Sequence, residues 1–351
     1  MLFRSDAVVG IAKNDDIVEI INSVMLDRRV VTFGDKLCHN MEGDKLQSTL
    51  PHYAYLRIAD GCSNKCSYCA IPLIRGKMRS RKMENIIEEA KKFAENGVKE
   101  LVLVAQDVTA YGIDLYKKYA LPDLLKELCK IDGIKWIRLL YCYPERMTDE
   151  LIETIKTEDK VLNYIDIPIQ HCNKEILRNM YRGGDEQSLR ELFAKLRREI
   201  PGVVLRTTLI TGFPGETEEQ FSELAEFVND IKFERLGCFA YSAEEDTPAA
   251  EMPDQVDEGE RQRRADIITS EQEIRMGEYY AGMVGNTYEV VCEGFDRYSD
   301  MYFGRSMHVA PEIDGMIYFT SAKDKGPLTI GDFVNVKITD VLENNLLGER
   351  V

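Results

Sequence analysis

The stretch Gly61-Cys62-Ser63-Asn64-Lys65-Cys66-Ser67-Tyr68-Cys69 places three cysteines within eight residues. It directly follows residues 53–59, Tyr-Ala-Tyr-Leu-Arg-Ile-Ala, which have the composition of a β-strand. Three thiolates on one short loop can converge on a single metal centre. A structural zinc site needs four ligands, whereas three thiolates on a cubane [4Fe–4S] cluster leave one iron open for another ligand. We expect the rest of the fold to be organised around this loop.

A three-cysteine zinc site completed from elsewhere in the chain is the alternative. The candidates for its fourth ligand are Cys38, His39, His171 and Cys172, and none lies at ligand spacing in a second zinc knuckle. A disulfide framework is less favoured, because the cysteine count of nine is odd and no secretory signal is evident. The spacing favours the iron–sulfur interpretation, while the zinc alternative stays open.

The composition is that of a soluble globular protein. The 351 residues are 44% hydrophobic and 30% charged, which allows a full catalytic domain and a smaller module. The first residues contain no apolar core of signal-peptide length, and no uninterrupted apolar run is long enough to span a membrane. The sequence therefore predicts a cytoplasmic protein without a membrane partner.

The charge distribution has one local exception. A net charge of −16 makes nucleic acid an unfavourable partner at long range. Residues 61–82, however, contain six basic residues and no acidic one. For most of these six we expect a solvated surface strip, and those nearest the cysteine loop are candidates to meet an anionic group of a substrate or cofactor.

Residues 51–282 alternate between strand-like and helix-like patterns. Six strand–helix pairs predict an α/β fold, an open, partial (β/α)6 barrel with its site at the carboxyl ends of the strands. The predicted strands are residues 53–59, 100–105, 136–141, 164–167, 203–210 and 235–241. The predicted helices are residues 83–96, 121–131, 149–157, 174–180, 186–199, 216–231 and 259–280.

Two smaller pieces flank this domain. Residues 1–50 contain a short strand (6–10), a helix (14–25) and a second strand (30–33), which is too little to hold a core of its own. A linker is predicted over residues 45–51. Residues 283–351 form short alternating runs between Gly, Pro and Asp turns, which predicts a small all-β barrel of about five strands. Four of them are placed at residues 287–293, 302–307, 316–319 and 333–341.

Polar residues follow five of the predicted strands, where the carboxyl ends of parallel strands meet. They are Gln106-Asp107, Tyr143-Pro144-Glu145, Gln170-His171, Thr211–Glu216 and Tyr241–Glu245. His171 is a candidate general acid or base, and the alternative is a hydrogen-bonded structural histidine. Gly212 and Gly215 permit close backbone approach to a ligand ahead of a helix N-terminus. The alternative for that turn is that Glu216 and Thr217 cap the helix.

Together these motifs resemble the methylthiotransferase branch of the radical S-adenosylmethionine (radical SAM) enzymes, across nearly the entire chain. The residues that carry the resemblance are Gly61–Pro72, Ile74–Gly76, Arg79–Arg81, Ala105–Asp107, Tyr111-Gly112 and Thr208–Glu216, with a TRAM-like barrel at the carboxyl end. Within that branch the chain is similar to the RimO type, which modifies a ribosomal protein, rather than to the tRNA-modifying type. That similarity is carried by Gln106-Asp107, Ile167–His171 and Ala310–Gly315.

The resemblance implies a reaction and its cofactors. Cys62, Cys66 and Cys69 would hold a [4Fe–4S] cluster whose open iron binds S-adenosylmethionine (SAM). A 5′-deoxyadenosyl radical from SAM would abstract hydrogen from an aspartate β-carbon of small-subunit ribosomal protein twelve, which accepts a methylthio group. Such a C–H bond has no useful acidity, so a cofactor radical is needed. The SAM-binding residues that the resemblance implies are Gln106, Gln170, Gly212, Gly215 and Glu216.

The resemblance and the charge also suggest partners. Residues 283–351 carry eleven acidic and six basic residues, a net charge of −5, which suits a basic ribosomal protein better than tRNA. A reductase or a flavodoxin-type protein would supply electrons. The alternative functions are a tRNA adenosine methylthiotransferase and, from another class, a cluster-binding or zinc-binding module without turnover.

The amino-terminal part departs from the family pattern. Family members carry an amino-terminal domain whose three cysteines hold a second, auxiliary [4Fe–4S] cluster that supplies sulfur. Here residues 1–50 resemble only the end of that domain, and the single Cys38 cannot replace three ligands. We therefore expect SAM cleavage from this sequence, with methylthio transfer incomplete.

Overall fold

The computed structural model describes residues 5–38, 41–43 and 46–351. His39, a candidate zinc ligand, and Lys45, the first residue of the predicted linker, lie outside these residues, as does the side chain of Cys38. No helix in the described part of the chain is both long and apolar enough to cross a membrane.

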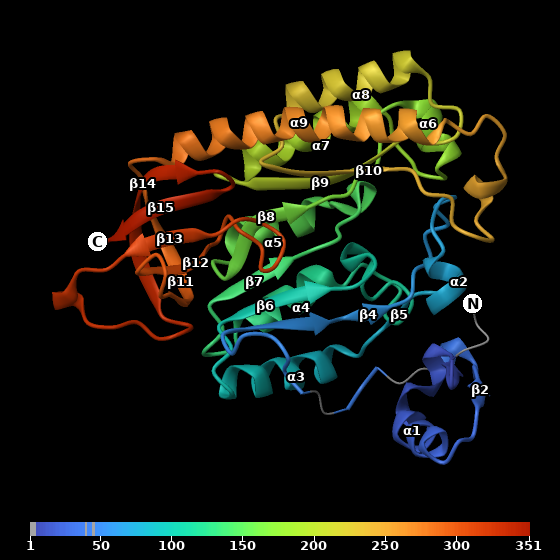
Figure 1. The fold of residues 1–351 in the computed structure, drawn as a ribbon, viewed down its shortest axis with the longest axis horizontal. Helices are drawn as coiled ribbons and strands as arrows, with labels where there is room; N and C mark the ends of the chain where they lie inside the picture. Colours follow the sequence, from blue (N-terminus) through green and yellow to red (C-terminus); the bar gives the residue numbers. More distant parts are fainter. Residues whose placement is uncertain (1–4, 39–40, 44–45) are drawn as a thin grey trace.

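A six-stranded parallel sheet forms the centre of the molecule (Figure 1). The strands lie side by side in the order in which they occur along the chain, which gives the sheet order β10-β9-β8-β7-β6-β3. Strands β3 and β10 form its two edges and do not pair with each other, so the barrel is open as predicted. Leu101, Val102 and Leu103 of β6 are fully buried, so both faces of this strand are covered. The six strands are β3 (Tyr53–Arg57), β6 (Glu100–Val104), β7 (Trp136–Leu139), β8 (Val161–Asp166), β9 (Val204–Thr211) and β10 (Arg235–Ala240).

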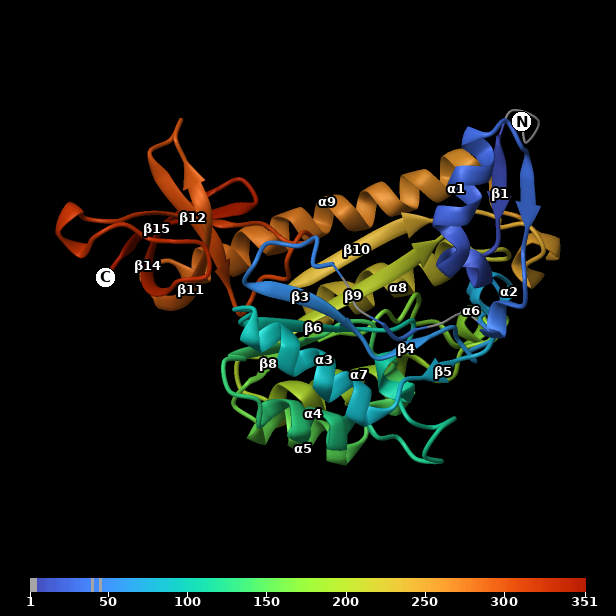
Figure 2. The ribbon, with the colours of Figure 1, turned by 90° about the horizontal axis from the view of Figure 1, so that it is seen from below.

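Helices cover the outer face of this sheet (Figures 1 and 2). Their apolar stripes pack on the strands in one continuous core. Asp185 and Thr217 begin two of the helices with capping boxes, in which side chain and backbone bond reciprocally. The helices are α3 (Met83–Glu95), α4 (Leu121–Cys129), α5 (Asp149–Thr157), α6 (Lys174–Asn179), α7 (Glu186–Glu199), α8 (Glu218–Ile231) and α9 (Glu258–Met283).

The amino-terminal piece forms a small unit beside the sheet (Figure 2). Strands β1 (Ala7–Val9) and β2 (Val30–Thr32) pair in parallel, joined by helix α1 (Ile17–Met25). Among the described residues before residue 52, Ile20 is the one buried hydrophobic side chain. Most other apolar positions of α1 are exposed, as expected for a piece too small to build its own core.

The carboxy-terminal residues form a closed five-stranded barrel in the order β11-β12-β13-β15-β14. The strands are β11 (Thr287–Asp296), β12 (Met301–Ser306), β13 (Ile317–Thr320), β14 (Phe333–Leu342) and β15 (Asn345–Arg350). The barrel class and strand number agree with the prediction. The sequence did not locate β15, which follows β14 after only two residues, Glu343 and Asn344.

This barrel docks on the amino-terminal ends of the sheet strands. Glu100, the first residue of β6, is fully buried and binds Arg138 Nε at 2.7 Å and Arg305 Nη2 at 2.8 Å. Arg305 also binds Glu293, which in turn contacts His52 Nε2 at 3.0 Å. Burial alone would raise the pKa of Glu100, but the two guanidiniums lower it to about 2.

The loop of residues 307–316, between β12 and β13, also reaches the sheet. Its Glu312 accepts a hydrogen bond from Tyr53 Oη at 2.7 Å, and its Asp314 accepts one from Tyr164 Oη at 2.8 Å. Ala310 of the same loop belongs to an apolar cluster that includes Trp136 at the start of β7. The barrel therefore closes one end of the sheet and leaves the carboxyl ends of the strands free for a site.

Candidate functional site

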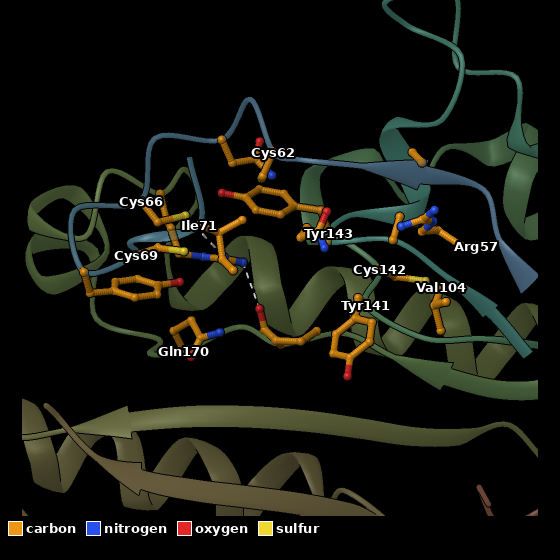
Figure 3. Close-up of a pocket in the computed structure, with 17 residues that line it drawn as sticks. Arg57, Cys62, Cys66, Cys69, Ile71, Val104, Tyr141, Cys142, Tyr143 and Gln170 are labelled. Atoms are coloured by element: carbon orange, nitrogen blue, oxygen red, sulfur yellow. Dashed lines mark hydrogen bonds between the residues drawn. The ribbon is translucent and has the colours of Figure 1, made fainter. Parts of the chain in front are cut away.

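A cavity of about 490 Å³ lies at the carboxyl ends of the strands (Figure 3). It receives residues from the cysteine loop and from the ends of β3, β6, β7 and β8. The residues that line it are Arg57, Ala59, Cys62, Asn64, Cys66, Tyr68, Cys69, Ile71, Val104, Ala105, Gln106, Tyr141, Cys142, Tyr143, Pro168, Gln170 and Arg182. All three cysteines of the loop are among them.

Local structure fixes the cysteine loop at both ends. The short strand β4 (Ala59–Asp60) leads into it and pairs with β5 (Arg79–Ser80), after helix α2 (Ile71–Arg75). Gly61, between β4 and the first cysteine, has φ of +74°, and a Cβ there would lie 2.4 Å from the carbonyl oxygen of Lys77. The Cys62 N–H then donates to Gly76 O at 3.1 Å. Only glycine fits position 61, because both the left-handed backbone and the close approach exclude a side chain.

The three thiols are unpaired and point toward the same cavity (Figure 3). Burial raises the pKa of Cys62 to about 11 and also raises the pKa of Cys69. Without a metal, these raised pKa values favour the protonated thiols. A bound metal favours the thiolates instead, because a coordinating thiol is deprotonated.

The thiols fit a cubane cluster better than a zinc ion. In the part of the chain that the structure describes, no three His, Cys, Asp or Glu side chains come close enough to hold one metal ion. A cubane binds each thiolate on a different iron, so its ligands need not meet at one point. His171 and Cys172, two candidates for a fourth zinc ligand, are buried and do not line the cavity.

Gln106 and Gln170 are two of the residues that the sequence analysis predicted to contact SAM. Both line the cavity, and the Oε1 atom of each is buried without a hydrogen-bond partner among the described residues. Gln170 has φ of +71°, and its backbone continues the sheet by bonding to Thr208 O and Ile210 N. Buried acceptors without partners are costly, so these two amides suit a ligand that brings donor groups.

Gly212, Gly215 and Glu216 do not line the cavity. Gly212 and Glu216 instead contact helix α9, and the Gly215 N–H donates to Asp254 O, ahead of that helix. Glu216 Oε2 accepts the Gly212 N–H at 3.0 Å, and Glu216 Oε1 accepts from Arg264 Nη1 at 2.8 Å. Thr217, rather than Glu216, caps α8, so the helix begins two residues after the predicted start.

His171 is fully buried and does not line the cavity. Its Nδ1 accepts the Asn173 N–H at 2.9 Å, and its Nε2 lies 3.6 Å from Glu216 Oε2. Burial, with a smaller contribution from Arg264, lowers the pKa of His171 to about 3. The histidine is therefore neutral near pH 7, and the geometry favours the structural alternative over acid–base catalysis.

Sequence reasoning missed several lining residues. Arg57 ends β3, and Arg182 follows α6; neither belongs to a recognisable motif. Tyr143 was identified at its strand end, but its place between the guanidiniums of Arg146 and Arg182 was not. No signal within one sequence joins these residues, because they meet only in the folded chain.

Comparison with known proteins identifies the family. Residues 56–228 match the radical SAM superfamily, and residues 284–351 match the TRAM domain. The ribosomal protein uS12 methylthiotransferase RimO of Caldanaerobacter subterraneus subsp. tengcongensis is 48% identical over 98% of this chain and 78% of that protein. The chain belongs to the RimO family of radical SAM methylthiotransferases. It is a transferase of the kind that uses a [4Fe–4S] cluster and SAM.

Other relatives agree with this RimO membership. The RimO of Clostridium botulinum is 48% identical over 98% of this chain and 76% of that protein. Among solved structures, the radical SAM methyltransferase TsrM from Kitasatospora setae has a TM-score of 0.53 at 14% identity, covering 69% of this chain and 52% of that one. That likeness supports the open barrel fold. The relatives favour the RimO type over the tRNA-modifying alternative.

Proposed function

We propose that this chain adds a methylthio group to the β-carbon of an aspartate in ribosomal protein uS12. The observation that carries the proposal is the cavity that holds all three cysteines at the carboxyl ends of the sheet, in a chain nearly half identical to proteins named uS12 methylthiotransferases. An acidic carboxy-terminal barrel, which suits a basic ribosomal protein, gives further support. Such a substrate is consistent with cytoplasmic activity.

In this proposal Cys62, Cys66 and Cys69 hold three irons of the cluster, and the fourth iron is left for SAM. Gln106 and Gln170 bind donor groups of SAM through their unpaired Oε1 atoms. When bound, the cluster and SAM together supply a radical that removes hydrogen from a carbon without acidity. Gly212 and Glu216 act indirectly, by holding the turn after β9 against α9, and Gly215 belongs to the same turn.

We also propose that a second [4Fe–4S] cluster supplies the sulfur. This sequence has no second set of three neighbouring cysteines, so in this proposal the auxiliary cluster has to be supplied for methylthio transfer to be completed. A reductase or flavodoxin-type protein is proposed as the electron donor.

Anaerobic reconstitution followed by incubation with SAM and dithionite tests the proposal. We expect 5′-deoxyadenosine from the wild-type chain and none from Cys66→Ala. With uS12 present and a source of auxiliary cluster added, mass spectrometry should detect a methylthio group on one aspartate. Modification of tRNA instead would replace the proposed substrate. A zinc ion without labile sulfide would overturn the radical SAM assignment itself.

A further inference from the structure

Arg182 lies beside one of the cysteine ligands. Helix α6 ends at Asn179, and Tyr181 then adopts the left-handed conformation with φ of +58°. The next residue turns back so that its N–H donates to Leu177 O at 2.8 Å. This geometry brings the guanidinium Nη1 of Arg182 to 4.0 Å from Cys66 Sγ, at hydrogen-bonding distance for sulfur.

The cysteine loop and the end of α6 are joined by hydrogen bonds. The Ser67 N–H donates to Met180 O at 3.0 Å, and Ser67 Oγ donates to Asn179 O at 2.7 Å. Ser67 is the residue directly after Cys66 and is fully buried. Arg182 and Cys66 are therefore held by one rigid unit, and their proximity does not depend on a flexible side chain alone.

The charge of Arg182 is buried and lacks an ion-pair partner among the described residues. The residue is 9% exposed, its Nη2 donates to Pro168 O at 2.8 Å, and its guanidinium stacks on the Tyr143 ring at 4.2 Å. No carboxylate in the described part of the chain lies within ion-pair distance of it, and Glu145 acts on it only from farther away. Arg146, on the same tyrosine, is instead neutralised by Asp107.

A buried cation without an anion is costly, so an anionic group should complete this site. The Cys66 thiolate, at hydrogen-bonding distance from Arg182, would supply that anion together with its cluster. We propose that Arg182 sets the reduction potential of the cluster, by stabilising the negative charge that one-electron reduction adds. The inference rests on the proposed function, in which the cluster is held by Cys62, Cys66 and Cys69.

Two physical effects act in the same direction. Hydrogen bonds to ligand sulfurs raise the reduction potential of iron–sulfur clusters. A positive charge in a site of low dielectric stabilises the reduced state more than it would in water. Arg182 is therefore a positioning and tuning residue that acts through the cluster, and it makes the electron easier to deliver.

The test is a redox titration of the cluster in the absence of SAM, in which electron paramagnetic resonance measures the reduced cluster at each potential. Arg182→Gln removes the charge, Arg182→Lys keeps it, and Arg178→Gln removes the same charge from an exposed position on α6. We expect Arg182→Gln to lower the reduction equilibrium constant at least tenfold, about 59 mV for a one-electron couple. The cluster of Arg182→Lys should have a reduction potential close to that of wild type, and the potential of Arg178→Gln should equal that of wild type.

Each outcome decides a different point. If wild type binds no cluster, the proposed function fails. If Arg182→Gln binds a cluster with the wild-type potential, only the present inference fails, and weaker SAM binding in that variant would assign the guanidinium to SAM. If Arg182→Gln cannot be loaded with a cluster, the lysine variant decides. A loaded Arg182→Lys variant with a potential near that of wild type supports the inference. Loading failure in both variants would limit Arg182 to packing on Tyr143 and overturn it.

Discussion

Gly212, in the loop after β9, lies directly against helix α9. Its φ is +68°, and a Cβ there would lie 2.3 Å from Arg261 Cγ and 2.9 Å from Arg261 Cα. We expect Gly212→Ala to destabilise the protein by about 3 kcal/mol, from the left-handed backbone together with overpacking. Thermal unfolding measures the loss.

Gly215 provides the matched control for this prediction. Its φ is +81°, but no atom lies within 4 Å of the position that a Cβ would take. Gly215→Ala should therefore cost only the left-handed backbone, about 1–2 kcal/mol. Equal losses in the two variants would show that contact with α9 does not explain the glycine at 212.

Buried His171 predicts a specific dependence of stability on pH. Its pKa is about 3 in the folded chain, against an ordinary value of 6.5, so the unfolded chain binds the extra proton between these values. The free energy of unfolding is therefore unaffected by this group above pH 6.5. It falls as the pH drops from 6.5 toward 3, because protonation of His171 favours the unfolded chain. Between pH 6.5 and pH 5 the loss is on the order of 2 kcal/mol.

The measurement compares wild type with His171→Asn, which keeps an acceptor for the Asn173 N–H. The melting temperature of wild type should fall more steeply with decreasing pH than that of the variant. Parallel curves would mean that His171 is not held neutral by burial. Activity near pH 7 should show no ionisation assigned to this residue, in line with its place outside the cavity.

The residues of the site were predictable to different degrees. The cysteines, Gln106 and Gln170 follow strand ends, and that signal is visible in the sequence. Glu216 follows a glycine-rich turn, and a carboxylate at such a position can either bind a ligand or hold the turn in place. The sequence did not distinguish these roles, because the partner of Glu216, Arg264, lies 48 residues away. Arg182 gave no signal at all, because its position depends on the turn at the end of α6.

At the scale of elements, the start of α8 depends on Thr217. Its side chain accepts the Gln220 N–H at 3.3 Å, and Gln220 Oε1 accepts the Thr217 N–H at 3.0 Å. Thr217→Ala should cost about 1 kcal/mol. Ser222→Ala, an exposed change inside the same helix, should be neutral or slightly stabilising. Chemical denaturation of both variants checks the cap, and equal stability would contradict it.

The elements themselves were largely predictable. The pattern located the six strands of the central sheet and the helices α3 to α9 within a few residues, but it did not locate the short helix α2. Strand β15 was not located, because Glu343 and Asn344 make the turn before it without the Gly or Pro that marks most turns. Helix α1 begins at Ile17 rather than Asn14, because a 3₁₀ segment, Ile11–Asp16, precedes it.

At the scale of the whole molecule, Arg305 joins the barrel to the sheet. It is buried and binds both Glu100 and Glu293. Arg305→Met should cost about 3–5 kcal/mol, because it leaves buried carboxylates without their partner. Thermal unfolding of the intact chain measures the effect.

An exposed ion pair across the same interface supplies the control. Glu289 of β11 contacts Lys135 at 2.6 Å, and both side chains are about two-fifths exposed. Glu289→Gln should change stability by less than about 1 kcal/mol. If it matched Arg305→Met, burial would not be what makes the Arg305 network important.

The contact between the barrel and the sheet has a consequence for protein engineering. The loop of residues 307–316 packs Ala310 and Met307 against Trp136, Leu140 and other side chains of the sheet. A cut near residue 283, where the sequence pattern changes, would leave this shared apolar surface facing water, and the shortened protein would tend to aggregate. A chimaera that exchanges barrels between relatives must therefore exchange the loop and its matching sheet residues together. The two parts are separate in sequence, but they share one hydrophobic cluster where they meet.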